Sequence, residues 1–453
     1  GGSAPSSFVT ANYASSQGAV NVNLGTGTAT DGMGGTDTLL NIDAVVGSSG
    51  NDVLTGGSTS SQILAIQWLE VFEGGLGNDT IDGGSGGDRV NYSNNLGAVT
   101  VTLADAGAGT AVEDNGLMGI STDTLSNIEQ IRGSVFGDNL NGNSSNNGIE
   151  GMAGNDLING GGGFDQARYS RSTGAINATL TGGGSGSVVD GLGGTDSLTG
   201  IEEIYASDFN DTLTGGSSND SFIGLAGNDA IDGGTGYDRA SYSIGPVGAG
   251  VTVTLTGTLG SGTAIDQYGN TDALTNIESV QGSHGNDTLT GNAARMQTGL
   301  MSDTPEQFEG MGGNDTIDGG TNVPSHFAQV SYANSPGSVG VTVNLGLGTA
   351  LDGFGGTDSL LNIDGVIGSS GNDMLTGGSS SSQVVATGLF EQFDGGAGND
   401  TIDGGNGTDR ANYNSAGGSV TVVLDTDGNS GNGYAGTATG GSGNDTLISI
   451  EHV

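Results

Sequence analysis

A glycine-rich nonapeptide recurs in tandem, and it restricts the fold of this chain more than any other feature. The repeat reads Gly-Gly-x-Gly-Asn-Asp, followed by three residues whose middle one is aliphatic, as in GGLGNDTID at 74–82 and GLAGNDAID at 224–232. The first six residues favour a turn, because Gly reaches positive φ without steric cost and Asn and Asp tolerate it best among the others. The last three favour a short strand whose middle side chain points inward.

Two successive nonapeptides are expected to form one coil of about 18 residues, with a strand on each side, and coils stack roughly 4.8 Å apart. A single repeat is too small to bury a core, so stability has to come from stacked neighbours. No stretch of useful length has helical periodicity. The sequence therefore predicts an all-β fold, a parallel β-roll or β-helix solenoid. If the whole chain formed such coils, it would contain about 25 of them.

A longer repeat contains the nonapeptides. Each copy opens near a Tyr and continues with an alternating apolar stretch such as VTVTL at 99–103, a glycine turn ending in Asp, an aliphatic ladder and then the nonapeptides. We expect one continuous solenoid over 1–453, and the tyrosines divide it into repeat units 13–91, 92–168, 169–241, 242–331, 332–412 and a partial 413–453.

A third level of repetition is visible between distant copies. The segments 39–62 and 360–383 are nearly identical, and Tyr13 and Tyr332 are 319 residues apart. We interpret the chain as a window cut from a longer repetitive protein; processing with degenerate ends is the alternative.

Charge excludes several classes of function. Fifty acidic residues stand against seven basic ones, so the net charge is −43. A nucleic-acid binder or a protein that binds anionic membranes needs a basic face, which this chain cannot build. Without Cys there are no disulfides and no thiolate metal sites. No apolar run reaches the roughly 18 residues that membrane insertion requires.

The regular Asp at the sixth position of the repeat indicates a cation site. Stacking places like charges on neighbouring coils about 5 Å apart, which is destabilising unless something neutralises them. Calcium takes six to eight oxygens at flexible geometry, including carboxylates and backbone carbonyls, whereas magnesium prefers a tight octahedron. A single Asp in such a turn can equally cap its own backbone. Recurrence at matched positions favours calcium.

At this point the sequence resembles the hemolysin-type calcium-binding repeat, the repeats-in-toxin or RTX family. The resemblance implies a right-handed parallel β-roll with calcium bound in the turns, about twenty Ca²⁺ in all. It carries the role of nonapeptide ligand to Asp52, Asp79, Asp88, Asp138, Asp156, Asp165, Asp211, Asp220, Asp229, Asp238, Asp287, Asp315, Asp373, Asp400 and Asp409. The turn before each ladder adds Asp37, Asp123, Asp196, Asp272, Asp358 and Asp445. The stretches 1–8, 142–147 and 319–327 lack the Asp, so no calcium is expected there.

Enzyme signals are absent: the three His residues are scattered, and no nucleophile elbow, HExxH or phosphate loop occurs. The leading hypothesis is an extracellular calcium-binding structural protein that folds on meeting calcium. It would build a surface fibre, filament, surface layer or adhesin stalk by self-association, with a cell-surface polysaccharide as a further candidate partner. The resemblance implies type I secretion to a bacterial surface. The alternatives are the non-catalytic repeat region of a larger secreted enzyme or toxin, and a face that binds ice or carbohydrate.

Two further features have open interpretations. Arg89, Arg239 and Arg410 directly follow a sixth-position Asp, and Arg168 comes three residues after one. We expect ion pairs that close a calcium stack, with ligand binding as the alternative. Longer segments replace a nonapeptide at 56–73, 291–309 and 377–394. We expect loops that pack a small core against the roll, with a contact patch for another chain as the alternative.

Overall fold

The computed structural model describes residues 8–57, 69–105, 107–256, 260–291, 305–320, 327–337, 339–378, 390–424, 434–441 and 443–453. The chain forms two compact units: unit 1 comprises 1–208 and 216–218, and unit 2 comprises 209–215 and 219–453. Nearly all regular structure in the described residues is β; the exception is one 3-10 turn at Gly116–Met118. No helix in these ranges is long and apolar enough to cross a membrane.

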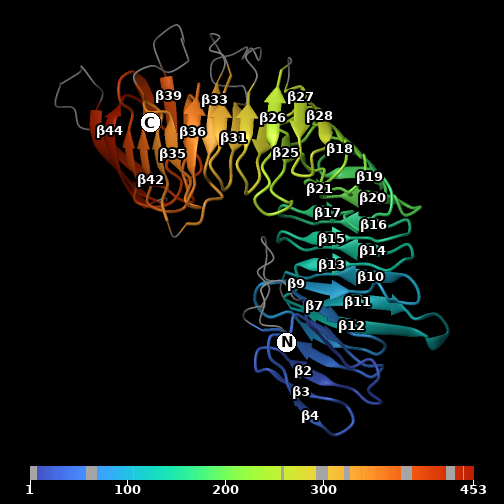
Figure 1. Cartoon of the computed structure of the whole chain (residues 1–453). Coiled ribbons are helices and arrows are strands. Elements are labelled where there is room, and N and C mark those ends of the chain that lie inside the picture. The colour runs from blue at the N-terminus through green and yellow to red at the C-terminus, as the bar shows by residue number, and fades with distance from the viewer. Residues whose placement is uncertain are drawn as a thin grey trace. The chain divides into compact units, whose positions relative to one another are not determined.

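One ladder in each unit contains only parallel strands, and we call it the first ladder (Figure 1). In unit 1 it runs β1 (Thr10–Asn12), β5 (Ala44–Val46), β7 (Leu69–Glu73), β9 (Gly87–Asn91), β13 (Gln130–Arg132), β15 (Gly148–Glu150), β17 (Gln166–Arg168) and β21 (Glu203–Tyr205). In unit 2 it runs β23 (Ser221–Ile223), β25 (Arg239–Ser241), β29 (Ser279–Gln281), β31 (Glu306–Glu309), β33 (Ala328–Ser331), β37 (Gly365–Ile367), β39 (Phe390–Asp394) and β41 (Thr408–Ala411).

The second ladder of each unit contains the other strand of each nonapeptide pair. These strands are β6 (Val53–Thr55), β8 (Thr80–Asp82), β14 (Asn139–Asn141) and β16 (Leu157–Asn159) in unit 1. In unit 2 they are β22 (Thr212–Thr214), β24 (Ala230–Asp232), β30 (Thr288–Thr290), β32 (Thr316–Asp318), β38 (Met374–Thr376) and β40 (Thr401–Asp403). Where nonapeptides follow one another without a spacer, as in β14 and β16, the strands pair in parallel.

The segments between the nonapeptide arrays correct the prediction of uniform coils. Each forms a three-stranded antiparallel meander within the second ladder. The meanders are β2 (Asn21–Asn23), β3 (Thr28–Thr30) and β4 (Thr36–Thr38); β10 (Val99–Thr102), β11 (Gly109–Asp114) and β12 (Ile120–Ser126); β18 (Asn177–Gly182), β19 (Ser185–Val189) and β20 (Thr195–Thr199); β26 (Thr252–Leu255), β27 (Gly262–Ile265) and β28 (Thr271–Thr275); β34 (Thr342–Asn344), β35 (Thr349–Leu351) and β36 (Thr357–Leu361); and β42 (Val420–Leu424), β43 (Tyr434–Gly440) and β44 (Gly443–Ile450).

The outer strands of a meander join it to its neighbours. For example, β12 pairs in parallel with β8, and β10 pairs in parallel with β14. A coil that contains a meander is therefore much longer than a simple one: matched residues lie 18 positions apart between Asp138 and Asp156, but 44 apart between Asp79 and Asp123. The physical reason is the glycine turn after the alternating stretch, which lets the chain reverse and pair with itself before it returns to the roll.

The core lies between the two ladders, and each ladder contributes a single layer of side chains to it. Phe72, Phe222, Phe308 and Phe393 from the first ladder and Ile81 from the second are fully buried. Burying each such side chain contributes about 1.5–3 kcal/mol. The structure therefore confirms an all-β roll with inward-pointing middle residues. Continuity of the solenoid through the junction of the two units stays a prediction.

We expect Phe72→Ala to lower the unfolding free energy by about 3–5 kcal/mol, because it leaves a cavity that the rigid ladders cannot close. Hydrogen exchange of the amides of β7 and β9 in calcium-containing buffer measures the loss. Thr80→Ala on β8 is the control, since Thr80 is exposed and the change should stay within about 0.5 kcal/mol. Equal protection in the two variants would contradict the packing described above.

Candidate cation-binding turns

The nonapeptide aspartates are connected by one repeated interaction. The backbone N–H of each sixth-position residue donates to a carboxylate oxygen of the matching residue on the next coil. Asp52 N–H donates to Asp79 Oδ1 at 2.7 Å, Asp138 N–H to Asp156 Oδ1 at 2.8 Å, and Asp211 N–H to Asp229 Oδ1 at 2.8 Å. The other edge of the roll does the same, as from Asp220 N–H to Asp238 Oδ1 at 2.8 Å.

The second carboxylate oxygen divides thirteen of the fifteen predicted nonapeptide ligands, all except Asp211 and Asp220, into two groups. In the first group, Oδ2 is buried and has no hydrogen-bond partner among the described residues. We call these the open aspartates: Asp79, Asp88, Asp156, Asp165, Asp229, Asp238, Asp315, Asp400 and Asp409. All are almost wholly buried. A buried carboxylate with an unpaired oxygen is costly unless a cation or proton satisfies it.

In the second group, a serine four residues earlier occupies both oxygens. Ser134 Oγ donates to Asp138 Oδ1 at 2.8 Å, its backbone N–H donates to Oδ2, and Val99 N–H also donates to Oδ1 at 2.7 Å. The serine-capped aspartates are Asp52, Asp138, Asp287 and Asp373, with Ser48, Ser134, Ser283 and Ser369 as their partners. The serine occupies the second repeat position, where six of the nine open turns have glycine and the other three have Met152, Leu225 or Met311.

The aspartates of the glycine turns before each ladder lie on the last strand of each meander. Asp123 accepts from Tyr92 Oη at 3.1 Å through Oδ2 and from Asp79 N–H at 2.9 Å through Oδ1. Asp37, Asp196, Asp272 and Asp358 likewise accept from Tyr13, Tyr169, Tyr242 and Tyr332, while Asp445 accepts from Asp400 N–H. The tyrosines of the first five repeat units therefore anchor their meanders to the roll, whereas Tyr413 Oη forms no such hydrogen bond. These six predicted ligands already have protein partners.

Several carboxylates that continue the same pattern were missed by sequence reasoning. Glu129, Glu202, Glu278 and Glu451 accept the N–H of Asp88, Asp165, Asp238 and Asp409 through Oε2. The available signal was an Ile-Glu pair that recurs in four of the six aliphatic ladders, with Ile-Asp in the other two. Asp190 and Asp352 also keep a buried, unpaired Oδ2 in the meander turns. At 142–147, where no calcium was expected, Asn147 takes the Asp position and carries no charge.

First-position glycines lie against the open carboxylates. A methyl group at position 74 or 151 would collide with Oδ2 of Asp79 or Asp156. The backbone thus forms a close cradle around the unpaired oxygen. No group of three or more Asp, Glu or His side chains converges on a single point in the described ranges. A cation held here would take its remaining oxygens from backbone carbonyls, which suits calcium. The open aspartates therefore fit a divalent cation of the kind the sequence predicts.

Burial without a cation makes these carboxylates weak acids. Burial, followed by repulsion from Asp123 and Asp52, raises the pKa of Asp79 to about 8. The same cause raises the pKa of Asp88, Asp156, Asp229 and Asp315 to about 8, of Asp238, Asp400 and Asp409 to about 7, and of Asp165 to about 6. At neutral pH the cation-free turns therefore oppose the fold.

The prediction that the arginines form ion pairs that close a calcium stack is wrong for Arg89. Its side chain lies on the outer face of the first ladder, where Nε donates to Gln130 Oε1 at 3.2 Å, because neighbouring residues on a strand point to opposite faces. Of the longer segments, 58–68, 292–304 and 379–389 lie outside the described residues, including Trp68. Phe72, at the end of the first segment, belongs to the core.

We predict that the calcium-free protein gains β-structure on acidification. Because the folded-state pKa values of the open aspartates exceed the unfolded value of about 3.9, protonation favours the fold. This stability is fully present below about pH 4 and is lost as the pH rises through the range 6 to 8. Circular dichroism of protein desalted into calcium-free buffer, read from pH 8 down to pH 5, measures it. A β-signal that is equal or larger at pH 8 would contradict the assignment.

Comparison with known proteins supports the geometry. The model of the RTX calcium-binding nonapeptide repeat matches residues 41–59, 70–94, 132–167, 205–240, 275–294, 303–322, 364–381, 387–415 and 430–449. No curated protein matches the chain. The matched stretches contain all nine open aspartates, and most of the meander strands lie between them. With this repeat distributed along its length and folded as a β-roll, the chain is an RTX-type calcium-binding repeat protein.

Proposed function

We propose that this chain is a calcium-stiffened structural segment of an extracellular protein, which assembles with further copies into a fibre, filament, surface layer or stalk. The observation that carries the calcium part is the set of nine buried carboxylate oxygens without a protein partner. RTX repeats bind calcium and are typical of proteins exported by type I secretion. Calcium outside the cell supplies the missing charge, so binding and folding are coupled.

Self-association is supported by an apolar position that recurs on the outer face of four of the six meanders; in the first and the last, Thr30 and Thr439 occupy it. In each of these four meanders, one residue of the middle strand pairs with the aspartate that accepts from the repeat tyrosine. The next residue along the middle strand is exposed and apolar: Val112, Val189, Ile265 or Leu351. Their exposed fractions are 38%, 49%, 49% and 52%. Scattered apolar residues on a surface are ordinary, whereas repeated exposure at one position favours a contact surface.

Different aspartates are expected to contribute differently to calcium binding. Asp156→Asn removes the charge of an open carboxylate, so the variant should bind at least one equivalent of calcium fewer than the parent chain. Asp138→Asn is the matched control, because its carboxylate is already occupied by Ser134 and Val99. Calcium counted by atomic emission after equilibrium dialysis gives the stoichiometry. Equal losses in the two variants would refute the distinction between open and serine-capped turns.

Assembly is tested on the four exposed apolar residues. We expect calcium-loaded protein to form ordered multimers, seen by light scattering and electron microscopy, and a chelator to dissolve both the multimers and the β-signal. The fourfold change of Val112, Val189, Ile265 and Leu351 to Ser should leave calcium-dependent folding intact and abolish the multimers.

The matched control changes four threonines to Ser. They pair with the four apolar residues across the neighbouring meander strand: Thr122, Thr195, Thr271 and Thr357. This control should assemble as the parent chain does. Monomeric parent protein at high concentration and saturating calcium would refute self-association but not calcium binding. β-structure that resists the chelator would refute the calcium mechanism itself.

A further inference from the structure

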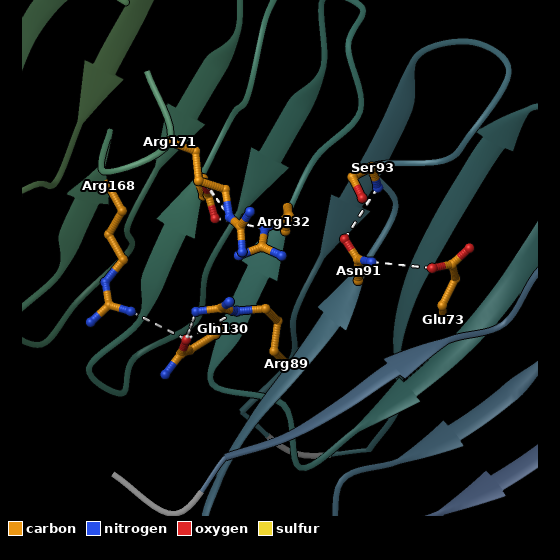
Figure 2. A network of polar contacts seen from close by, with 9 residues as sticks. Glu73, Arg89, Asn91, Ser93, Gln130, Arg132, Arg168 and Arg171 are labelled. Atoms are coloured by element: carbon orange, nitrogen blue, oxygen red, sulfur yellow. Dashed lines mark hydrogen bonds and ion pairs between the residues drawn. The ribbon is translucent and has the colours of Figure 1, made fainter. Parts of the chain in front are cut away.

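Four of the seven basic residues of the chain gather on the outer face of the first ladder in unit 1. Arg89 lies on β9, Arg132 on β13 and Arg168 on β17, and Arg171 follows β17. The parallel register places Gln130 beside Arg89 and Glu150 beside Arg132. Figure 2 shows Arg89 and Arg168 on either side of Gln130, with Arg171 reaching toward Arg132. We call these four residues the arginine cluster.

Glu150 is the carboxylate that pairs with the cluster. Its Oε2 accepts from Arg132 Nε at 2.6 Å, and its Oε1 lies 3.5 Å from Arg171 Nε as an ion pair. Arg168 Nε donates to Gln166 Oε1 at 3.0 Å, and its guanidinium lies 5.3 Å from the ring centre of Tyr205. Two of the four guanidinium groups, those of Arg89 and Arg168, are therefore bound to neutral glutamine acceptors, although the chain as a whole is strongly acidic.

Burial makes this excess of positive charge unfavourable. The side chain of Arg132 is 12% exposed. Like charges held together on a half-buried surface are stabilised by a bound anion, and the planar guanidinium fork matches a carboxylate with two parallel hydrogen bonds.

A cavity of about 370 Å³ adjoins the cluster. Arg89, Arg132 and Arg171 form its charged wall, and Phe8, Leu69 and Val71 are among its apolar lining residues. Glu73 also faces the cavity, but its carboxylate accepts from Asn91 Nδ2 at 3.2 Å and from Asn94 Nδ2 at 2.9 Å. Pockets of this size, apolar with a few convergent polar groups, hold small organic molecules.

We propose that this cavity binds the carboxylate of a uronic acid, as one residue of an acidic polysaccharide, with Arg89, Arg132 and Arg171 on the carboxylate and Phe8 and Leu69 against the sugar ring. The charged wall alone would suit any oxyanion. The apolar wall selects an anion with a carbon body of monosaccharide size. This site is separate from the cation-binding turns, because the outer face of a strand points away from the core.

The test uses the full calcium-loaded chain in chloride buffer and titrates it with D-glucuronate, D-glucose and inorganic phosphate by calorimetry. We expect glucuronate to bind and glucose to bind at least ten times more weakly. Equal binding of glucose, no binding of glucuronate at millimolar concentration, or tighter binding of phosphate than of glucuronate would each overturn the proposal.

Two variants separate the cluster from the calcium sites. Arg171 is 58% exposed, so Arg171→Gln should keep the fold and the calcium stoichiometry while weakening glucuronate binding at least tenfold. Arg89→Gln should have the same effect from the buried side of the cluster. The control Arg410→Gln removes one positive charge from β41 of unit 2 and should bind as the parent does. If glucuronate bound through calcium instead, Arg171→Gln would bind it unchanged, and the proposal would fail.

Discussion

The hydrogen bond from the backbone N–H of one turn to the carboxylate of the matching turn on the next coil is the interaction on which the rest of the structure depends. It continues from coil to coil within each unit and fixes the stacking of neighbouring turns. A carboxylate serves better than a neutral acceptor, because charge-assisted hydrogen bonds are stronger. The same choice places one buried charge on nearly every coil, so the interaction that aligns the roll also makes it dependent on cations.

The structure resolves this conflict in two ways. Serine-capped turns satisfy their carboxylate with the hydroxyl and N–H of a serine from the same turn, as Ser134 does for Asp138. Open turns leave one oxygen for an external partner, as Asp156 does on the next coil. Capped turns occur where a meander joins the roll, since Val20, Val99, Val251 and Val341, just before or at the start of a meander strand, also donate to them. At those joints both carboxylate oxygens of the aspartate have protein partners, whereas the nonapeptide pairs between them leave one oxygen unpaired.

The meanders enlarge the second ladder without disturbing the coil stack. Five of the six are held by the repeat tyrosine, whose hydroxyl donates to an aspartate on the last meander strand, as from Tyr169 to Asp196 at 3.0 Å. Their outer faces carry the recurrent apolar residues, while the first ladder of unit 1 carries the arginine cluster. The unpaired carboxylate oxygens, the recurrent apolar residues and the arginine cluster thus occupy three different parts of one fold. They are the sites of the proposed cation binding, self-association and anion binding.

The sequence by itself determined the coil: glycine and Asp at set positions specify the turn, and the alternation of aliphatic and polar residues specifies which side chains are buried, because both are local constraints on φ, ψ and side-chain direction. It also identified the aspartates that line the turns. The serine cap is local too, because Ser48 occupies both carboxylate oxygens of Asp52 from four residues away. Only the tertiary structure decided the other partners, since Val20 donates to Asp52 and Tyr92 donates to Asp123 from 32 and 31 residues away. The meanders and the arginine cluster were hidden for the same reason: antiparallel pairing and the outer face of a parallel ladder bring together residues whose spacing along the chain follows no fixed period.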